Sequence, residues 1–328
     1  MAWYLREKVA HLRRLWRLPE LVAMSERLEV RLEKLEQCSE VSLRDIQSRL
    51  NGLEHGNSTI HRTTAEIQRE SRRTAIQTED CLRDLIELVL GRAWVPRLDL
   101  RLQAAHQVAD SSPDHYAPRG TANDNTRHLR FVRRCEQHYS EIRHMDVGCA
   151  GGGLVWDFTI RGHWSVGIEG SDFNLRNQRA EWRTIPDRLF TADITRPFAL
   201  CDREGNHVLF NVITAWETFE HIPTNQVRTT IQNLAANLAQ DGTMVCSIAT
   251  FVDRDENTGI VYHQTVKERE WWVNEFASCK LKPVEGLFDV DDFVRGSGNP
   301  RAYDWDVTLN PELGFHLVLR RFDSEGEG

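Results

Sequence analysis

The first part of the chain repeats apolar residues at alternating steps of four and three. Leu28, Leu32 and Leu35 begin the seam of this repeat, which continues through Leu43, Ile46, Leu50, Leu53, Ile60 and Ile67. Such a repeat predicts a coiled coil. Asn57, Thr64 and Ser71 fall on the same seam and weaken it. We therefore expect residues 20–95 to form an imperfect coiled coil or helical hairpin that joins copies of the chain. A helical arm folded onto the second domain is the alternative.

The first nineteen residues interleave aromatic and leucine side chains with basic ones. Trp3, Leu15 and Trp16 are examples of the first kind, and Arg13 and Arg17 of the second. A basic amphipathic helix of this composition can lie at the surface of an anionic membrane. It can equally dock onto its own protein, and the sequence leaves both alternatives open.

The pattern changes after about residue 95. Residues 96–125 are rich in proline, aspartate, serine and glycine, and we interpret them as a linker and lead-in segment. From residue 126 to 323, short β-branched runs alternate with helix-like stretches, which predicts an α/β domain with a mainly parallel sheet. We expect helices at about 224–239 and 265–276, and strands ending near residue 147 and at 163–172, 188–194, 211–217, 241–250, 281–288 and 314–322. Residues 324–328 form a tail.

Composition and charge narrow the class of protein. The chain has 328 residues, room for about two domains, and 40% of them are hydrophobic, enough for a core. A formal net charge of −8 weighs against a protein whose main task is to grip a phosphate backbone. Seven scattered cysteines fit a reduced compartment, and no run approaches the ~20 apolar residues of a membrane span. With no signal peptide in the first residues, we expect a cytoplasmic protein, at the membrane edge if residues 1–19 bind there.

A glycine-rich turn is the first sign of a ligand site. The stretch HMDVGCAGGGLVWDF, residues 144–158, runs from a strand end through glycines into a helix. Glycine allows a sharp turn and close approach of a ligand, and the helix start offers unpaired N–H groups. Two acids follow at the ends of the next strands, Glu169 and Asp193. Because a carboxylate can accept hydrogen bonds from a ribose diol, Glu169 is a candidate for that contact.

The order of these motifs resembles the class I S-adenosylmethionine-dependent methyltransferases over about residues 125–322. This resemblance implies a Rossmann-like, seven-stranded methyltransferase sheet with flanking helices. It also implies that the glycine turn holds the methionine end, Glu169 the ribose hydroxyls and Asp193 the adenine side. Ala150 departs from the family pattern, which usually has glycine there. A dinucleotide enzyme ranks lower because the chain lacks G-x-G-x-x-G. The expected cofactor-binding residues are Asp146, Gly148, Ala150, Gly152, Glu169, Gly170, Ser171, Asp193, Ile194 and Trp216.

A second cluster follows the fourth strand in the stretch TAWETFEHI. Glu217, Glu220 and His221 fall on one face if this stretch is helical, and His263 lies further along. Such residues suit methyl transfer to a hydroxyl, which must lose its proton or be polarised. His221 could act as a general base, or the cluster could hold a divalent metal. The residues expected at the reaction are therefore His221, Glu217 and His263.

The spacing Glu-x-x-Glu-His resembles two metal-dependent groups of methyltransferases. One comprises the O-methyltransferases of ubiquinone synthesis, and the other the 2′-O-methyltransferases of small-RNA 3′ ends. The resemblance implies a Mg²⁺ or Mn²⁺ site with Glu217, Glu220, His221 and His263 as ligands. The alternative is a Glu–His pair that caps a helix and packs the cofactor floor.

The acceptor is harder to predict than the cofactor. The stretches HQTV and EWW and the lead-in PDHYAPRGTANDN resemble methyltransferases encoded with surface-polysaccharide enzymes. We therefore expect O-methylation of a sugar hydroxyl in a surface polysaccharide or other glycan. The alternatives are an RNA 2′-O-methyltransferase and a coiled-coil assembly protein whose domain binds cofactor without turnover. A long aperiodic stretch, residues 289–313, is a candidate substrate lid or a flexible insertion.

Overall fold

The computed structural model describes residues 67, 71, 98–110, 112–288, 307 and 310–322. The chain divides into two compact units, residues 1–71 and 72–328, and the fold below belongs to the second. The amphipathic helix expected at 1–19, the coiled coil expected at 20–95 and the tail at 324–328 lie outside the described residues, apart from residues 67 and 71. Most of the candidate lid at 289–313 also lies outside them.

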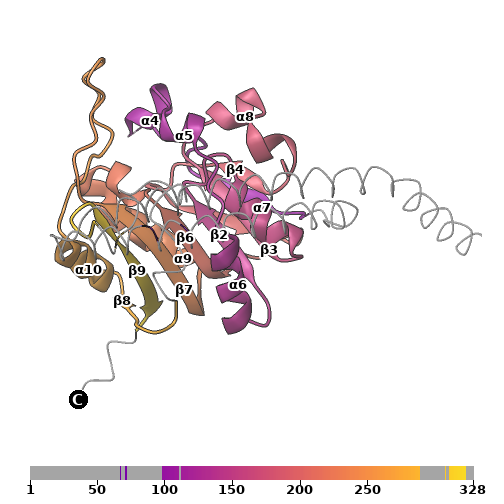
Figure 1. Cartoon of the computed structure of the whole chain (residues 1–328). Coiled ribbons are helices and arrows are strands. Elements are labelled where there is room, and N and C mark those ends of the chain that lie inside the picture. Colours follow the sequence, from indigo (N-terminus) through magenta and orange to yellow (C-terminus); the bar gives the residue numbers. More distant parts are fainter. Residues whose placement is uncertain are drawn as a thin grey trace, which may run out of the picture. The chain divides into compact units, whose positions relative to one another are not determined.

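A mixed seven-stranded sheet forms the centre of the domain (Figure 1). Its strand order is β4-β3-β2-β6-β7-β9-β8, and the first five of these strands run parallel. Strand β9 is antiparallel to both of its neighbours. The strands are β2 (Arg143–Val147), β3 (Trp164–Glu169), β4 (Leu189–Thr191), β6 (Phe210–Trp216), β7 (Leu238–Ala249), β8 (Leu281–Pro283) and β9 (Gly314–Arg321).

Helices cover both faces of this sheet because its strands alternate side chains between two cores. In β6, Ile213 and Ala215 join the core that includes residues of α9 and α10. Val212 and Trp216 point the other way and join the core built on α6 and α7. The longer helices are α6 (Leu129–His138), α7 (Gly153–Ile160), α9 (Val227–Asn237) and α10 (Arg269–Ser278).

The predicted elements are present, with boundaries that tertiary contacts have moved. The helix expected at 265–276 begins only at Arg269, because the backbone N–H and hydroxyl of Thr265 bond to the Glu220 and Ile222 carbonyls. Trp272 and Phe276 of this helix are buried in the core. The strand expected at 281–288 ends at Pro283, which has no backbone N–H for the ladder.

The segment interpreted as linker and lead-in carries more structure than its composition indicated. Strand β1 (Arg101–Ala104) pairs with β5 (Phe198–Cys201) in a separate two-stranded sheet. Two short helices follow, α4 (Pro113–Tyr116) and α5 (Gly120–Asn123), which Figure 1 shows at the same end of the sheet as α8 (Phe173–Asn177). No helix among the described residues is both long and apolar enough to span a membrane.

Candidate active site

A cavity of about 460 Å³ lies where the parallel strands end. The strand order reverses between β2 and β6, and ligands of open α/β sheets bind at such switch points. Four of the residues expected from the sequence do not line the cavity, although each lies close to residues that do. They are Asp146, Gly152, Ser171 and Glu220. The residues expected from the sequence that do line it are Gly148, Ala150, Glu169, Gly170, Asp193, Ile194, Trp216, Glu217, His221 and His263.

The glycine-rich turn after β2 depends on close backbone packing. Gly148 has a φ of 70°, and a Cβ at this position would come within 2.4 Å of Thr218 Oγ1. Ala150 occupies the left-handed region with a φ of 42°, where a glycine would be unstrained. Gly152, with a φ of 87°, precedes the first turn of α7. The turn therefore presents bare backbone to the cavity at Gly148.

Glu169 ties this turn to the end of β3. Its Oε2 accepts a hydrogen bond from the Ala150 N–H at 2.8 Å, and its Oε1 accepts one from the Ser171 N–H at 3.2 Å. The Thr121 hydroxyl donates to Oε1 from the lead-in segment at 3.4 Å. Burial raises the pKa of Glu169, against the lowering effect of the backbone hydrogen bonds. The acid and the turn thus form one hydrogen-bonded unit at the cavity wall.

Asp146 belongs to a buried polar chain behind the cavity. The Thr214 hydroxyl donates to Asp146 Oδ1 at 2.6 Å and lies 2.8 Å from His144 Nε2. His144 Nδ1 lies 2.8 Å from the Ser165 hydroxyl. Burial raises the pKa of Asp146 to about 7 and holds the pKa of His144 well below its ordinary value. This chain crosses three strands beneath the glycine-rich turn.

The cluster after β6 has a different local structure from the one predicted. Glu217 adopts a φ of 49° directly after the strand, and only Phe219–His221 form a short 3₁₀ turn, η2. The prediction that Glu217, Glu220 and His221 share one helical face is therefore wrong. The physical reason is that β6 extends to Trp216. The N–H of the next residue, Glu217, then donates a hydrogen bond to the Ser247 carbonyl of β7.

Glu220 and the two histidines nevertheless meet. The Glu220 carbonyl accepts hydrogen bonds from the Gln264 and Thr265 N–H groups, which brings His263 next to η2. The rings of His221 and His263 lie 5.0 Å apart, edge to face. Glu220, His221 and His263 each offer a ligand atom, and these atoms lie within 4.8 Å of one another. Glu217 is not a member of this group.

Each histidine of the group has a defined environment. His263 Nδ1 donates to the Phe251 carbonyl at 2.7 Å, which leaves Nε2 as the nitrogen with the lone pair. Burial lowers the pKa of His221 to about 3, assisted by the neighbouring His263 and Arg119. The His221 imidazole is therefore neutral at physiological pH. A neutral imidazole is the form that either accepts a proton or binds a metal.

The lead-in segment covers the cavity, a role that its composition did not reveal. His115 lies against the end of β3, since a Cβ on Gly170 would come within 2.6 Å of its Nε2. Arg119 forms an ion pair with Asp253, and its guanidinium lies 4.1 Å from the centre of the Tyr262 ring. We call the described residues 109–110 and 112–124 the cover. Ser112 at the N-cap and Pro113 at the first helical position were the available signal for α4.

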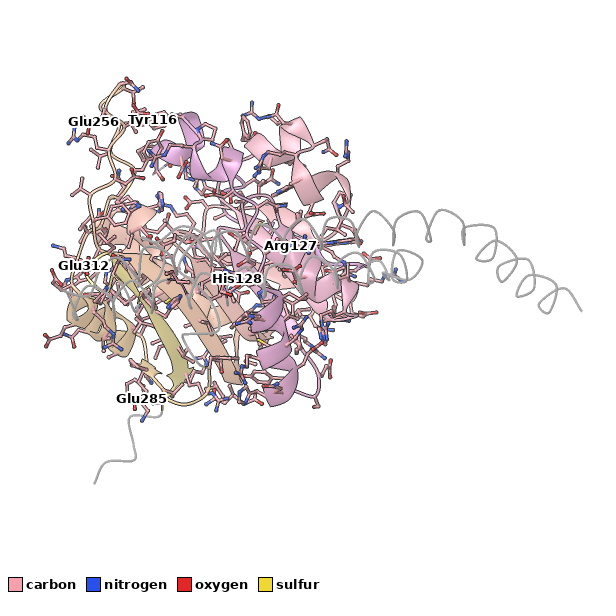
Figure 2. All side chains as sticks on the ribbon, viewed as in Figure 1. Tyr116, Arg127, His128, Glu256, Glu285 and Glu312 are labelled. Carbon is pink, nitrogen blue, oxygen red and sulfur yellow. The ribbon has the colours of Figure 1, made fainter. Side chains whose placement is uncertain are left out.

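The cover meets a loop that projects from the sheet between β7 and α10. The Tyr262 hydroxyl donates to the Ala117 carbonyl at 3.0 Å, which adds a second contact beside the Arg119 ion pair. Figure 2 shows Tyr116 of α4 at the same end of the molecule as Glu256, which lies in this loop. The cavity is thus closed from two sides by segments far apart in the sequence.

The comparisons with known proteins agree with this architecture. A family model described as a methyltransferase domain matches residues 115–282, slightly more than half of the chain. The chain belongs to the methyltransferase domain family. The match begins inside the cover and ends in β8, so it includes the cavity and the cluster after β6. No curated protein matches this chain.

Solved structures similar to the methyltransferase are only distantly related in sequence. An S-adenosylmethionine-dependent methyltransferase from Clostridium acetobutylicum has 10% identity and a TM-score of 0.42, covering 61% of this chain and 94% of that one. The CcbJ methyltransferase from Streptomyces caelestis has 11% identity and a TM-score of 0.41, covering 65% and 96%. CalS10, an amino pentose methyltransferase from Micromonospora echinaspora, has 17% identity and a TM-score of 0.40, covering 58% and 89%.

The family match makes the protein a methyltransferase, and the charges that line its cavity suit S-adenosylmethionine as the methyl donor. S-adenosylmethionine carries a positive sulfonium and an ammonium group. Apart from the histidines, Arg119 is the one basic residue among the described residues that line the cavity. Carboxylates come from Asp114, Asp124, Glu169, Asp193, Glu217 and Asp253. An acidic cavity with an exposed glycine backbone suits a cationic ligand.

Proposed function

We propose that the methyltransferase transfers the methyl group of S-adenosylmethionine to a sugar hydroxyl of a surface polysaccharide or other glycan. The observation that carries this proposal is that His221 and His263, which line the cavity, meet the buried carboxylate of Glu220. A hydroxyl is a weak nucleophile until its proton is removed or its oxygen is polarised. Imidazoles and a carboxylate beside the methyl donor can remove that proton, or hold a cation that polarises the oxygen.

The cofactor would lie across the ends of β2, β3 and β4. We assign the ribose contact to Glu169, whose carboxylate reaches the cavity, and the adenine side to Asp193 and Ile194. Gly148 would approach the methionine end with its backbone, since a side chain there would meet Thr218. Bound in this way, the cofactor supplies an electrophilic methyl group, and the residues around it hold the donor and acceptor in line.

The acceptor's oxygen would face His221 and His263. We place a divalent cation, Mg²⁺ or Mn²⁺, at Glu220, His221 and His263, where it would polarise the hydroxyl or chelate a diol of the sugar. The donor set of one carboxylate and two imidazoles fits such an ion. Glu220 has one oxygen held by the Ala249 N–H at 3.0 Å, which fixes the orientation of its carboxylate. The other route is a general base at His221 without metal.

The acidic lining weighs against a phosphate-rich acceptor. An RNA strand would bring its backbone charge toward Asp114, Glu217 and Asp253 and would meet one arginine at the cavity. Like charges at short range repel, so a neutral or cationic acceptor is favoured over RNA.

Methyl transfer from labelled S-adenosylmethionine tests the acceptor class. Surface glycans from cells that lack this protein and total RNA would be offered separately to the full-length enzyme. We expect label on a sugar after hydrolysis of the glycan, and none on RNA. His221→Ala should lose at least ~100-fold in rate. His138→Ala, a change at an exposed histidine away from the cavity, should keep full activity. Label on RNA alone would refute the glycan assignment.

Metal removal tests the cation site. We expect EDTA to abolish methyl transfer and excess Mg²⁺ or Mn²⁺ to restore it. Mn²⁺ binding, followed by electron paramagnetic resonance without any acceptor, should weaken at least ~10-fold in His263→Ala, because a ligand is lost. His138→Ala serves again as the matched control. Full activity in EDTA, with no Mn²⁺ bound, would leave the general-base route through His221.

A further inference from the structure

Asp114 of the cover points into the cavity beside the reactive cluster. It is almost fully buried, with 9% of its surface exposed. Its Oδ1 accepts a hydrogen bond from the Arg119 N–H at 2.8 Å, which fixes one side of the carboxylate to its own segment. Its Oδ2 lies 3.3 Å from His221 Nδ1. The carboxylate is therefore held by the cover and directed at the imidazole.

His221 Nδ1 is the matching atom on the other side. This nitrogen is buried and makes no hydrogen bond within the part of the chain that the structure describes. Hydrogen bonds of catalytic groups are often long before the site is filled, and they tighten on binding. At 3.3 Å the two atoms are already close enough, so a small reorientation of the carboxylate or the ring would align them for a hydrogen bond.

We propose that Asp114 is a positioning residue that accepts a hydrogen bond from His221 Nδ1–H and so fixes the imidazole tautomer. This inference rests on the proposed function, in which His221 serves the reaction. With the proton held at Nδ1, the lone pair lies at Nε2, where it meets the acceptor hydroxyl or the bound cation. A carboxylate also stabilises the positive charge that the ring acquires when it takes up a proton.

The contacts of the cover explain how Asp114 keeps its place. The Ser112 hydroxyl accepts from the Asp114 N–H at the start of α4, and Ala109 bonds through its N–H to the Gly170 carbonyl. On the other side, the Arg119 ion pair and the Tyr262 hydrogen bond join the cover to the loop that leads into His263. The position of Asp114 is thus set by the same loop that positions the second imidazole of the cluster.

Nitrogen NMR of the imidazole tests the tautomer without any acceptor. Long-range ¹H–¹⁵N spectra of full-length protein with labelled histidine distinguish protonated from unprotonated ring nitrogens, and His221→Gln assigns the signal. We expect His221 to carry its proton on Nδ1. In Asp114→Asn, the side-chain oxygen can still accept from Arg119 N–H, while its NH₂ donates to the ring and moves the proton to Nε2. Asp110→Asn, an exposed change on the same segment, should leave the tautomer unchanged. A wild-type proton on Nε2, or an unchanged tautomer in Asp114→Asn, would overturn the proposal.

Kinetics separate a positioning role from a purely structural one. With the acceptor that the labelling experiment identifies, Asp114→Asn should lower kcat ~10–100-fold and leave KM for S-adenosylmethionine within about twofold. In a His221→Ala background the same substitution should cause no further loss, because Asp114 acts through that ring. A further loss of the same size in the double variant would refute the proposal. If His221→Ala alone leaves the rate unchanged, the proposed function fails, and the tautomer measurement still decides whether Asp114 sets the ring.

Discussion

Three carboxylates near the glycine-rich turn look alike in the sequence and differ in their surroundings. Glu169 lines the cavity and bonds to backbone N–H groups of the turn and of Ser171. Asp193 also lines it, and its Oδ1 accepts from the Thr195 N–H and hydroxyl at 2.9 and 2.7 Å. Asp146 is buried behind the turn with Thr214 as its partner. The sequence predicted that each of these carboxylates lies at the end of a strand. The direction in which each side chain points depends on the register of the strands, which the sequence does not give.

The buried carboxyl of Asp146 should make stability depend on pH. Its pKa is raised from 3.8 to about 7, so its favourable contribution to folding is complete below about pH 4 and is lost as pH rises through 7. We expect Asp146→Asn, which keeps the oxygen that accepts from Thr214, to be more stable than the wild type by roughly 2–4 kcal/mol at pH 8. The difference should shrink toward pH 4.

Urea unfolding at several pH values between 4 and 8 measures this effect. Other titrating groups are common to both proteins and cancel in the difference, apart from Glu169, which interacts with Asp146. If the free energy of unfolding changed with pH in the same way in Asp146→Asn and in the wild type, the pKa of the Asp146 carboxyl would be equal in the folded and unfolded states. That result would contradict the prediction.

At the scale of elements, the sequence predicted the sheet well and the cover poorly. The runs around Val166, Ile213 and Val245 are β-branched and apolar, so local pattern alone identifies their strands. The end of β6 was predicted to within one residue, but the turn at Glu217 was not, because it depends on hydrogen bonds to β7. The structure of the lead-in segment was missed because β1, before the cover, pairs with a strand nearly a hundred residues later, and because the helices of the cover are short. Such helices are too short to show a periodic pattern.

Contacts between the cover and the projecting loop should control how often the cavity opens. Arg119→Gln removes the ion pair with Asp253 and the contact with the Tyr262 ring. Because these contacts are local, we expect amide hydrogen exchange in residues 112–124 to speed up about tenfold while β6 and β7 stay protected. Mass spectrometry of the exchanged protein reads this directly.

Arg143→Gln is a matched control for that substitution. Arg143 also combines an ion pair, with Glu141, and a contact with an aromatic ring, Trp164, but it lies at the start of β2 away from the cover. Equal exchange of residues 112–124 in both variants and the wild type would mean that Arg119 does not hold the cover closed.

At the scale of the whole molecule, the division between residues 71 and 72 falls inside the predicted oligomerisation region, residues 20–95, and leaves the whole methyltransferase domain in the second unit. The heptad seam lies mainly in the first unit, while the cavity lies wholly in the second. We expect deletion of residues 1–90 to lower the number of chains in the assembly, as measured by light scattering. S-adenosylmethionine affinity, measured by calorimetry, should stay the same. An unchanged number of chains would contradict the coiled-coil prediction.

The cover precedes the sheet in the chain, yet its holding contacts lie as far along as Asp253 and Tyr262. A ribosome that adds about 5–20 residues per second covers that distance in roughly 7–30 s. During this interval the cover can bond to the end of β3 through Ala109 and Gly170 but lacks its partners in the projecting loop. The cover is therefore fastened on its second side only when nearly the whole domain has been synthesised.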